Sequence, residues 1–159
     1  MLQILLRLVH IVSGGVWVGM FVFTTAFLMP ALADVGPDAG KVMAALAKRR
    51  IMTVMPLLAI LTIGSGIWLM IRFGAAGGSA AMQSPMGRLL GVGALASIIA
   101  FLIGITIVRP TMTRMAALGP DPAKRDEIAR LRRRAATVNQ IVALLLLIAL
   151  AAMAVARYA

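Results

Sequence analysis

The stretch "LRLVHIVSGGVWVGMFVF", residues 6–23, decides the fold of this chain. It lies within an apolar run over residues 5–28, which is about as long as the ~20 residues that a membrane-spanning helix needs. Three further runs of this kind cover residues 51–73, 87–108 and 138–156. The chain of 159 residues is 62% hydrophobic, with a mean hydropathy of +0.99, which is more apolar than a soluble domain. The sequence therefore predicts an all-α fold, an integral membrane four-helix bundle that forms a single domain over residues 1–159.

Basic residues predict the topology. Of the 16 Lys and Arg residues, twelve lie on two loops. One loop joins the first and second spans, the other joins the third and fourth spans, and both lie on the same side of the membrane. The twelve residues are Lys41, Lys48, Arg49, Arg50, Arg109, Arg114, Lys124, Arg125, Arg130, Arg132, Arg133 and Arg134. The positive-inside rule places both loops in the cytoplasm and both termini outside. We therefore expect a multi-pass protein of the bacterial cytoplasmic membrane, whose basic "RLRRRAA" meets anionic lipid headgroups, not nucleic acid.

Local signals predict where the helices begin and end. Ser84-Pro85 and Asp121-Pro122 each place a capping side chain before a proline, which is typical of a helix start. A helix is expected to run from Asp121-Pro122 into the fourth span without a break. The stretch "GAAGGSAAMQS", residues 74–84, is expected to be a flexible loop outside the membrane.

His10 is the only histidine of the chain, and it lies inside the first span. Ionisable groups within a bilayer are costly and are usually functional. The imidazole has two interpretations: a hydrogen bond to a neighbouring helix, or a ligand for haem iron or copper. On a helix it shares one face with Gly14 and Trp17, and Gly14 would leave a flat space beside the ring for a planar cofactor. Gly15 and Gly19 lie on the adjacent face and are expected to support helix packing.

Three arginines are expected near the same end of the bundle as His10. Arg7 is one turn from His10, and Arg72 and Arg88 flank the outer ends of the second and third spans. All five acidic residues lie on the opposite side of the predicted membrane. Arginines without acidic partners suit an anionic group such as a haem propionate, and they equally suit lipid phosphates.

Part of the chain resembles a known superfamily. "LVHIVSGGVWVGMFVFTTAFLMPAL", residues 8–32, resembles the first helix of the copper-resistance D-type membrane proteins, with His10, Trp17 and Gly19 at the matching positions. "KRRIMTVMPLLAILTIGSGIWLM", residues 48–70, is similar to part of the bacterial membrane protoporphyrinogen oxidases, which have a similar four-helix architecture. The resemblance implies a bundle that handles copper or b-type haem, with His10 as the ligand. The oxidases carry a functional lysine at the third helix, whereas this helix begins with Arg88, which argues against oxidase activity.

Methionine is the other candidate ligand, because its thioether is a soft donor that selects Cu(I). Met82 and Met86 form the pair that we expect to bind copper in the outer segment. Two inner pairs, in "IMTVM" and "MTRM", are weaker candidates, because methionine is also an ordinary filler of apolar gaps.

Three functions are therefore open. The first is a membrane protein that binds haem b or copper through His10, in electron transfer or metal handling. The second is a non-catalytic accessory subunit that packs in a homo-oligomer or a larger membrane complex, and the third is a methionine-based copper transporter. The sequence shows no catalytic constellation. Asn139 and Gln140 are the only amides near the fourth span and are expected to bond across helices.

Overall fold

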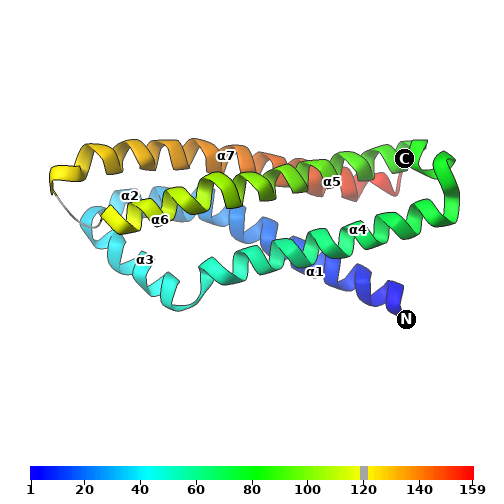
Figure 1. Cartoon of the computed structure of the whole chain (residues 1–159), viewed down its shortest axis with the longest axis horizontal. Helices are drawn as coiled ribbons and strands as arrows, with labels where there is room; N and C mark the ends of the chain where they lie inside the picture. The colour runs from blue at the N-terminus through cyan, green and yellow to red at the C-terminus, as the bar shows by residue number, and fades with distance from the viewer. Residues whose placement is uncertain (119–121) are drawn as a thin grey trace.

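The computed structural model describes residues 1–118 and 122–159, which form long helices joined by short turns (Figure 1). The elements are α1 (Leu2–Phe23), η1 (Thr24–Leu28), α2 (Met29–Val35), η2 (Gly36–Asp38), α3 (Ala39–Lys48), α4 (Ile51–Gln83), α5 (Pro85–Ile103), η3 (Gly104–Val108), α6 (Arg109–Leu118), η4 (Pro122–Lys124) and α7 (Arg125–Ala156). η1 and η3 are π-helical segments that continue the helices on either side of them, whereas η2 and η4 are single turns of 3-10 helix.

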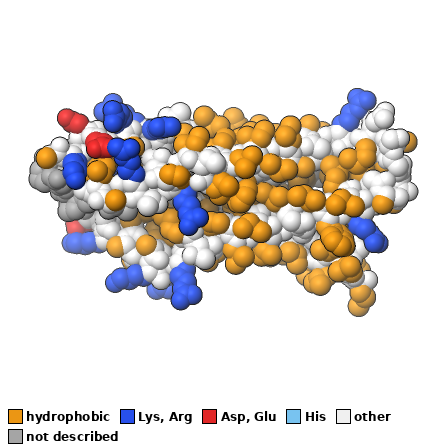
Figure 2. Space-filling model, in the orientation of Figure 1, with side chains coloured by type: hydrophobic (Ala, Val, Ile, Leu, Met, Phe, Trp, Pro, Cys, Tyr) orange, Lys and Arg blue, Asp and Glu red, His pale blue; other side chains and the backbone are white. Residues whose placement is uncertain are grey.

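The molecule is elongated and its two ends differ. Both termini and the turn between α4 and α5 lie at one end, here called the terminal end (Figure 1). The opposite end, here called the basic end, contains α2, α3, α6 and the beginning of α7. Figure 2 shows a broad apolar band around the middle and most of the visible Lys and Arg side chains at the basic end. The Lys and Arg residues that cluster in two loops of the sequence therefore also lie together at one end of the molecule (Figure 2).

Four helical segments in the described part of the chain are long and apolar enough to cross a membrane. They cover Leu2–Val35, Ile51–Gln83, Pro85–Met115 and Asp126–Ala156. Many of their large apolar side chains are exposed, as expected for residues that face lipid. The all-α four-helix prediction is confirmed, and each helix extends beyond the apolar run that predicted it. The protein is therefore a multi-pass membrane protein, while the orientation with both termini outside stays a prediction.

The helices associate mainly as two pairs, α1 with α4 and α5 with α7, and α4 also packs on α5. Small residues allow close approach at the centre, where Trp17 packs with Ala59, Ala100, Val142 and Leu146. Small residues are common between membrane helices, because apolar side chains gain nothing by leaving lipid and close backbone packing supplies the attraction.

The predicted helix start at Ser84-Pro85 is confirmed, because the Ser84 hydroxyl accepts a hydrogen bond of 3.1 Å from the backbone nitrogen of Gly87. The predicted loop over residues 74–84 is wrong: α4 continues to Gln83 and bends at Gly78, which has a φ of 63°. Alanine is the best helix former, so the alanines of this stretch sustain the helix, and only glycine adopts this bend without strain. α7 runs unbroken into the fourth span as predicted; Asp121 lies outside the described residues.

Both π-helical segments end two residues before a proline, Pro30 after η1 and Pro110 after η3. A proline within a helix cannot donate a backbone hydrogen bond, and its ring clashes with the carbonyl group four residues earlier. Those carbonyls belong to Ala26 and Thr106, each inside the π-helical segment. The wider turns there give the carbonyl room and let both helices continue.

The orientation can be tested with single cysteines, because the chain has no native cysteine. Ser79 lies at the terminal end and Ala123 at the basic end. A membrane-impermeant maleimide added to intact cells is expected to label Ser79→Cys and not Ala123→Cys, because the positive-inside rule places the basic end in the cytoplasm. Labelling of both positions after permeabilisation is the control. Labelling of Ala123→Cys alone in intact cells would reverse the orientation.

Candidate functional site

His10 lies at the contact between α1 and α4. Its Nδ1 donates a hydrogen bond of 2.8 Å to the carbonyl oxygen of Thr62, and the Ser65 hydroxyl lies 3.4 Å from the same nitrogen. The His10 side chain is half-buried, and Trp17, two turns further along the same face, is only 5% exposed. The prediction that His10 faces the bundle is confirmed, and the bond that holds it goes to the neighbouring helix.

Hydroxyl groups continue this polar contact along α1 and α4. The Thr62 hydroxyl lies 2.9 Å from the Ser13 hydroxyl and 2.7 Å from the carbonyl oxygen of Leu58. Ser13 donates to the carbonyl oxygen of Val9 at 2.6 Å. Each of these buried groups has a partner, as a site inside a bilayer requires, because lipid offers none.

Two glycines let α1 and α4 approach at this point. A methyl group at Gly66 would lie 2.8 Å from Cε1 of His10, and one at Gly14 would lie 3.1 Å from Cγ2 of Thr62. The flat space expected beside Gly14 is therefore taken by Thr62. The expected packing role of Gly15 and Gly19 is wrong within this chain, because both face open space, rotated away from the His10 face.

The hydrogen bond to Thr62 determines which nitrogen of His10 is free. The Nδ1–H that binds the Thr62 carbonyl leaves Nε2 as the free nitrogen, and this is the arrangement that metal-ligating histidines adopt. The edge of the ring that carries Cε1 lies against Gly66, which leaves little space on that side of the ring. The described residues also contain no group of three or more His, Asp or Glu side chains that could hold a metal ion. Haem b and copper stay predictions for His10.

All three predicted arginines are exposed, and one of them also lines a small cavity. Arg7 and Arg88 are exposed, and Arg72 lines a small cavity of ≈ 20 Å³ with Leu6 and Trp68. His10 lines neither this cavity nor the larger one described below.

Met82 and Met86 lie on different helices. Met82 is in the last turn of α4 and Met86 is in the first turn of α5, and Ser84 between them is extended, with φ −61° and ψ 158°. A spacing of four residues therefore does not bring them onto one helical face. Copper binding by this pair stays a prediction.

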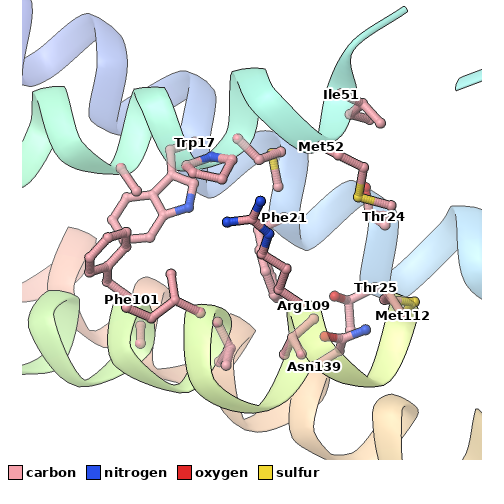
Figure 3. A pocket seen from close by; sticks show the side chains of 18 of the residues that line it. Trp17, Phe21, Thr24, Thr25, Ile51, Met52, Phe101, Arg109, Met112 and Asn139 are labelled. Carbon is pink, nitrogen blue, oxygen red and sulfur yellow. The ribbon is translucent and has the colours of Figure 1, made fainter. Parts of the chain in front are cut away.

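A larger cavity of ≈ 170 Å³ lies at the basic half of the bundle, where it is partly enclosed by α1, η1, α2, α3, α4, α5, η3, α6 and α7 (Figure 3). Three aromatic side chains line it: Trp17, Phe21 and Phe101. Five methionines also line it, and they are Met29, Met43, Met52, Met55 and Met112. An engineered protein cavity of about 150 Å³ with apolar walls binds benzene, so this cavity has room for a ring or a short length of chain.

Irregular backbone borders this cavity on two helices. Residues of η1 and η3 line it, and so does Pro56, which lies inside the regular helical part of α4. π-helical segments are rare and are frequent at functional sites. Regular helices would bring their side chains together here, so the irregular segments account for the space between them.

A few polar groups converge on the otherwise apolar walls. Arg109, the first residue of α6, extends its guanidinium into the cavity (Figure 3). The Thr25 hydroxyl and the Asn139 side-chain oxygen are both buried, and neither has a hydrogen-bond partner in the described part of the chain. The bond across helices that we expect for Asn139 is therefore not made by its oxygen. An apolar cavity with a few convergent polar groups is the usual form of a small-molecule site.

Sequence reasoning missed this second site. In the sequence, Arg109 indicates only topology and the inner methionines are weak copper ligands, because the convergence of these side chains depends on the irregular helix geometry. A signal was available in the repeated text "FLMP" and "IVRP", where a proline follows an apolar run in the first and third spans. No protein-family model, curated protein or solved structure matches the chain.

Proposed function

We propose that this membrane protein binds an apolar or amphipathic small molecule from the bilayer in the cavity at its basic half. The observation that carries the proposal is a cavity of ≈ 170 Å³ kept between helices that depart from regular geometry in two π-helical segments. Because the cavity is only partly enclosed, an apolar molecule that enters it from the bilayer gains contacts with its walls.

The walls indicate which ligands fit. Methionine side chains are flexible and adapt to ligands of irregular shape, and aromatic rings add large contact areas. Five thioethers also suit Cu(I), but the Arg109 guanidinium in the same cavity repels a cation. An organic ligand therefore suits the cavity better than copper. An accessory role in a larger complex stays a prediction that this proposal does not exclude.

Trp17 provides the test, because it lines the cavity and the second tryptophan, Trp68, is outside it. In detergent-purified Trp68→Phe protein, the methyl ester of terminally brominated dodecanoic acid is expected to quench Trp17 emission with saturation, since bromine quenches at contact. The Trp17→Phe variant is the control, because its remaining Trp68 meets only ester that is dissolved in the detergent. Quenching of Trp68 should therefore rise linearly with ester concentration and should not saturate.

A side chain grown into the cavity should compete with the ester. Gly104 lines the cavity and has open space beside its Cα, so Gly104→Leu should abolish the saturable quenching. The matched control is Gly91→Leu on α5, whose position also faces open space but does not line the cavity. Linear quenching of Trp17 in the parent protein, or equal loss in both leucine variants, would refute the proposed function.

A further inference from the structure

We infer that the polar groups of this cavity recognise the anionic head of an amphipathic ligand, a carboxylate or a phosphate, while its apolar part lies among the aromatic and methionine side chains. This inference rests on the proposed function and assigns the chemical class of the ligand. Arg109 binds the charge, and Thr25 and Asn139 supply further hydrogen bonds.

Arg109 is an exposed residue that lines the cavity, and no acidic side chain in the described part of the chain pairs with it. Among the residues that the structure describes, the ion pairs are Lys41–Asp38 and Arg114–Glu127, and Arg109 takes part in neither. Arg109 directly follows η3, and its side chain returns into the cavity (Figure 3). A guanidinium beside apolar walls calls for an anion, because charge-assisted and often bidentate bonds to carboxylate or phosphate are its strongest interactions.

Thr25 differs from other threonines on the helices. Thr62, Thr106 and Thr111 each place their hydroxyl on the carbonyl oxygen four residues earlier, at 2.6–2.7 Å. Thr25 lies inside η1, and its buried hydroxyl makes no such bond. A buried hydroxyl without a partner costs about 1–3 kcal/mol, which a ligand oxygen would recover.

Asn139 provides the second unpaired group. Its side chain is only 6% exposed, its oxygen has no partner in the described chain, and it lines the cavity with Arg109 and Thr25. Figure 3 shows Thr25 and Asn139, from η1 and α7, beside the same part of the cavity. The orientation of an asparagine amide is assigned from its hydrogen bonds, so with an anion bound its nitrogen can turn to donate. The anionic group that we infer would lie among these side chains, which come from η1, α6 and α7.

Two membrane molecules carry this chemistry: a free amphipathic acid and an anionic phospholipid. The shared element is an anionic head attached to an apolar chain. The choice between them depends on whether the head is a carboxylate on a single chain or a phosphate that stays in the bilayer surface, and the experiment below separates them.

The test compares terminally brominated dodecanoic acid, at a pH where it is ionised, with its methyl ester, by quenching of Trp17 in the Trp68→Phe protein. The acid is expected to bind at least about tenfold more tightly than the ester, and Arg109→Gln should remove this preference while ester binding persists. Arg132→Gln is the matched control, because it removes one exposed arginine at the same end without touching the cavity. Thr25→Val should weaken binding of the acid severalfold without lowering the thermal stability of the free protein.

A phospholipid arm uses nanodiscs that contain brominated phosphatidylglycerol or brominated phosphatidylcholine. Stronger quenching of Trp17 by the glycerol lipid, with no such difference for Trp68 in the Trp17→Phe protein, assigns the anion to a phospholipid; a preference seen only with the free acid assigns it to a carboxylic acid. Equal affinity for acid and ester together with equal quenching by both lipids overturns the inference and leaves the proposed function standing. Absence of saturable quenching by the ester and by the acid overturns both.

Discussion

Replacing Gly87 by alanine is expected to destabilise the folded bundle by about 3 kcal/mol, at the upper end of the usual cost of overpacking. A methyl group at Gly87 would clash with the carbonyl oxygen of Ala81 and lie 2.6 Å from that of Met82. Both are backbone atoms of the last turn of α4, so they cannot rotate away as a side chain would. The backbone shift would also strain the bond from Gly87 to the Ser84 hydroxyl. Unfolding in detergent, followed by far-ultraviolet circular dichroism, measures the loss.

Gly91 is the matched control for this substitution. It lies one turn further along α5, and a methyl group there meets open space. Gly91→Ala is expected to leave stability unchanged or to raise it by up to about 1 kcal/mol, because alanine favours the helix over glycine. Similar unfolding curves for the two variants would show that the turn is not packed as described.

The second large effect is expected at Gly66, where alanine should cost about 2 kcal/mol. A methyl group would lie 2.8 Å from Cε1 and 3.1 Å from Nδ1 of His10. The imidazole is rigid and its Nδ1 is bound to the Thr62 carbonyl, so the ring can move only by breaking that bond. Gly64→Ala on the same helix meets nothing within 4 Å and serves as the control.

A double-mutant cycle separates the clash from a general helix effect. With His10→Ala in the background, Gly66→Ala has no ring to meet and should lose most of its cost. Additive effects of the two substitutions would contradict the contact. The same purified proteins test the haem prediction, because a Soret band that His10→Ala removes would place the iron on this histidine.

Much of the fold could be predicted from the sequence, because lipid imposes strong and local requirements. A helix must satisfy its own backbone groups, so apolar runs about 20 residues long indicate spans. The same reasoning predicted that His10 faces a partner within the bundle, which its bond to Thr62 confirms. Ser84-Pro85 is a purely local signal, and it too is confirmed.

The candidate site could not be predicted in the same way, because it depends on small differences in helix phase. On α1 the close approach uses Gly14 and not Gly15, a choice set by a rotation of about 100° per residue. The cavity depends on two π-helical segments that displace Thr25 and Arg109 from the positions that a regular helix would give them. The spacing of apolar residues in the sequence does not predict either of these displacements.

The glycine contacts also show which helices pack most closely on each other. Close contacts at Gly14 and Gly66 join α1 to α4, and the contact at Gly93 joins α5 to α7, whereas a methyl group at Gly104, which lines the cavity, would meet nothing within 4 Å. The tight contacts therefore lie within the two helix pairs, α1 with α4 and α5 with α7, whereas the cavity lies between residues of both pairs. Separating the two pairs would widen the cavity and leave the bond of His10 to Thr62, which lies within one pair, intact.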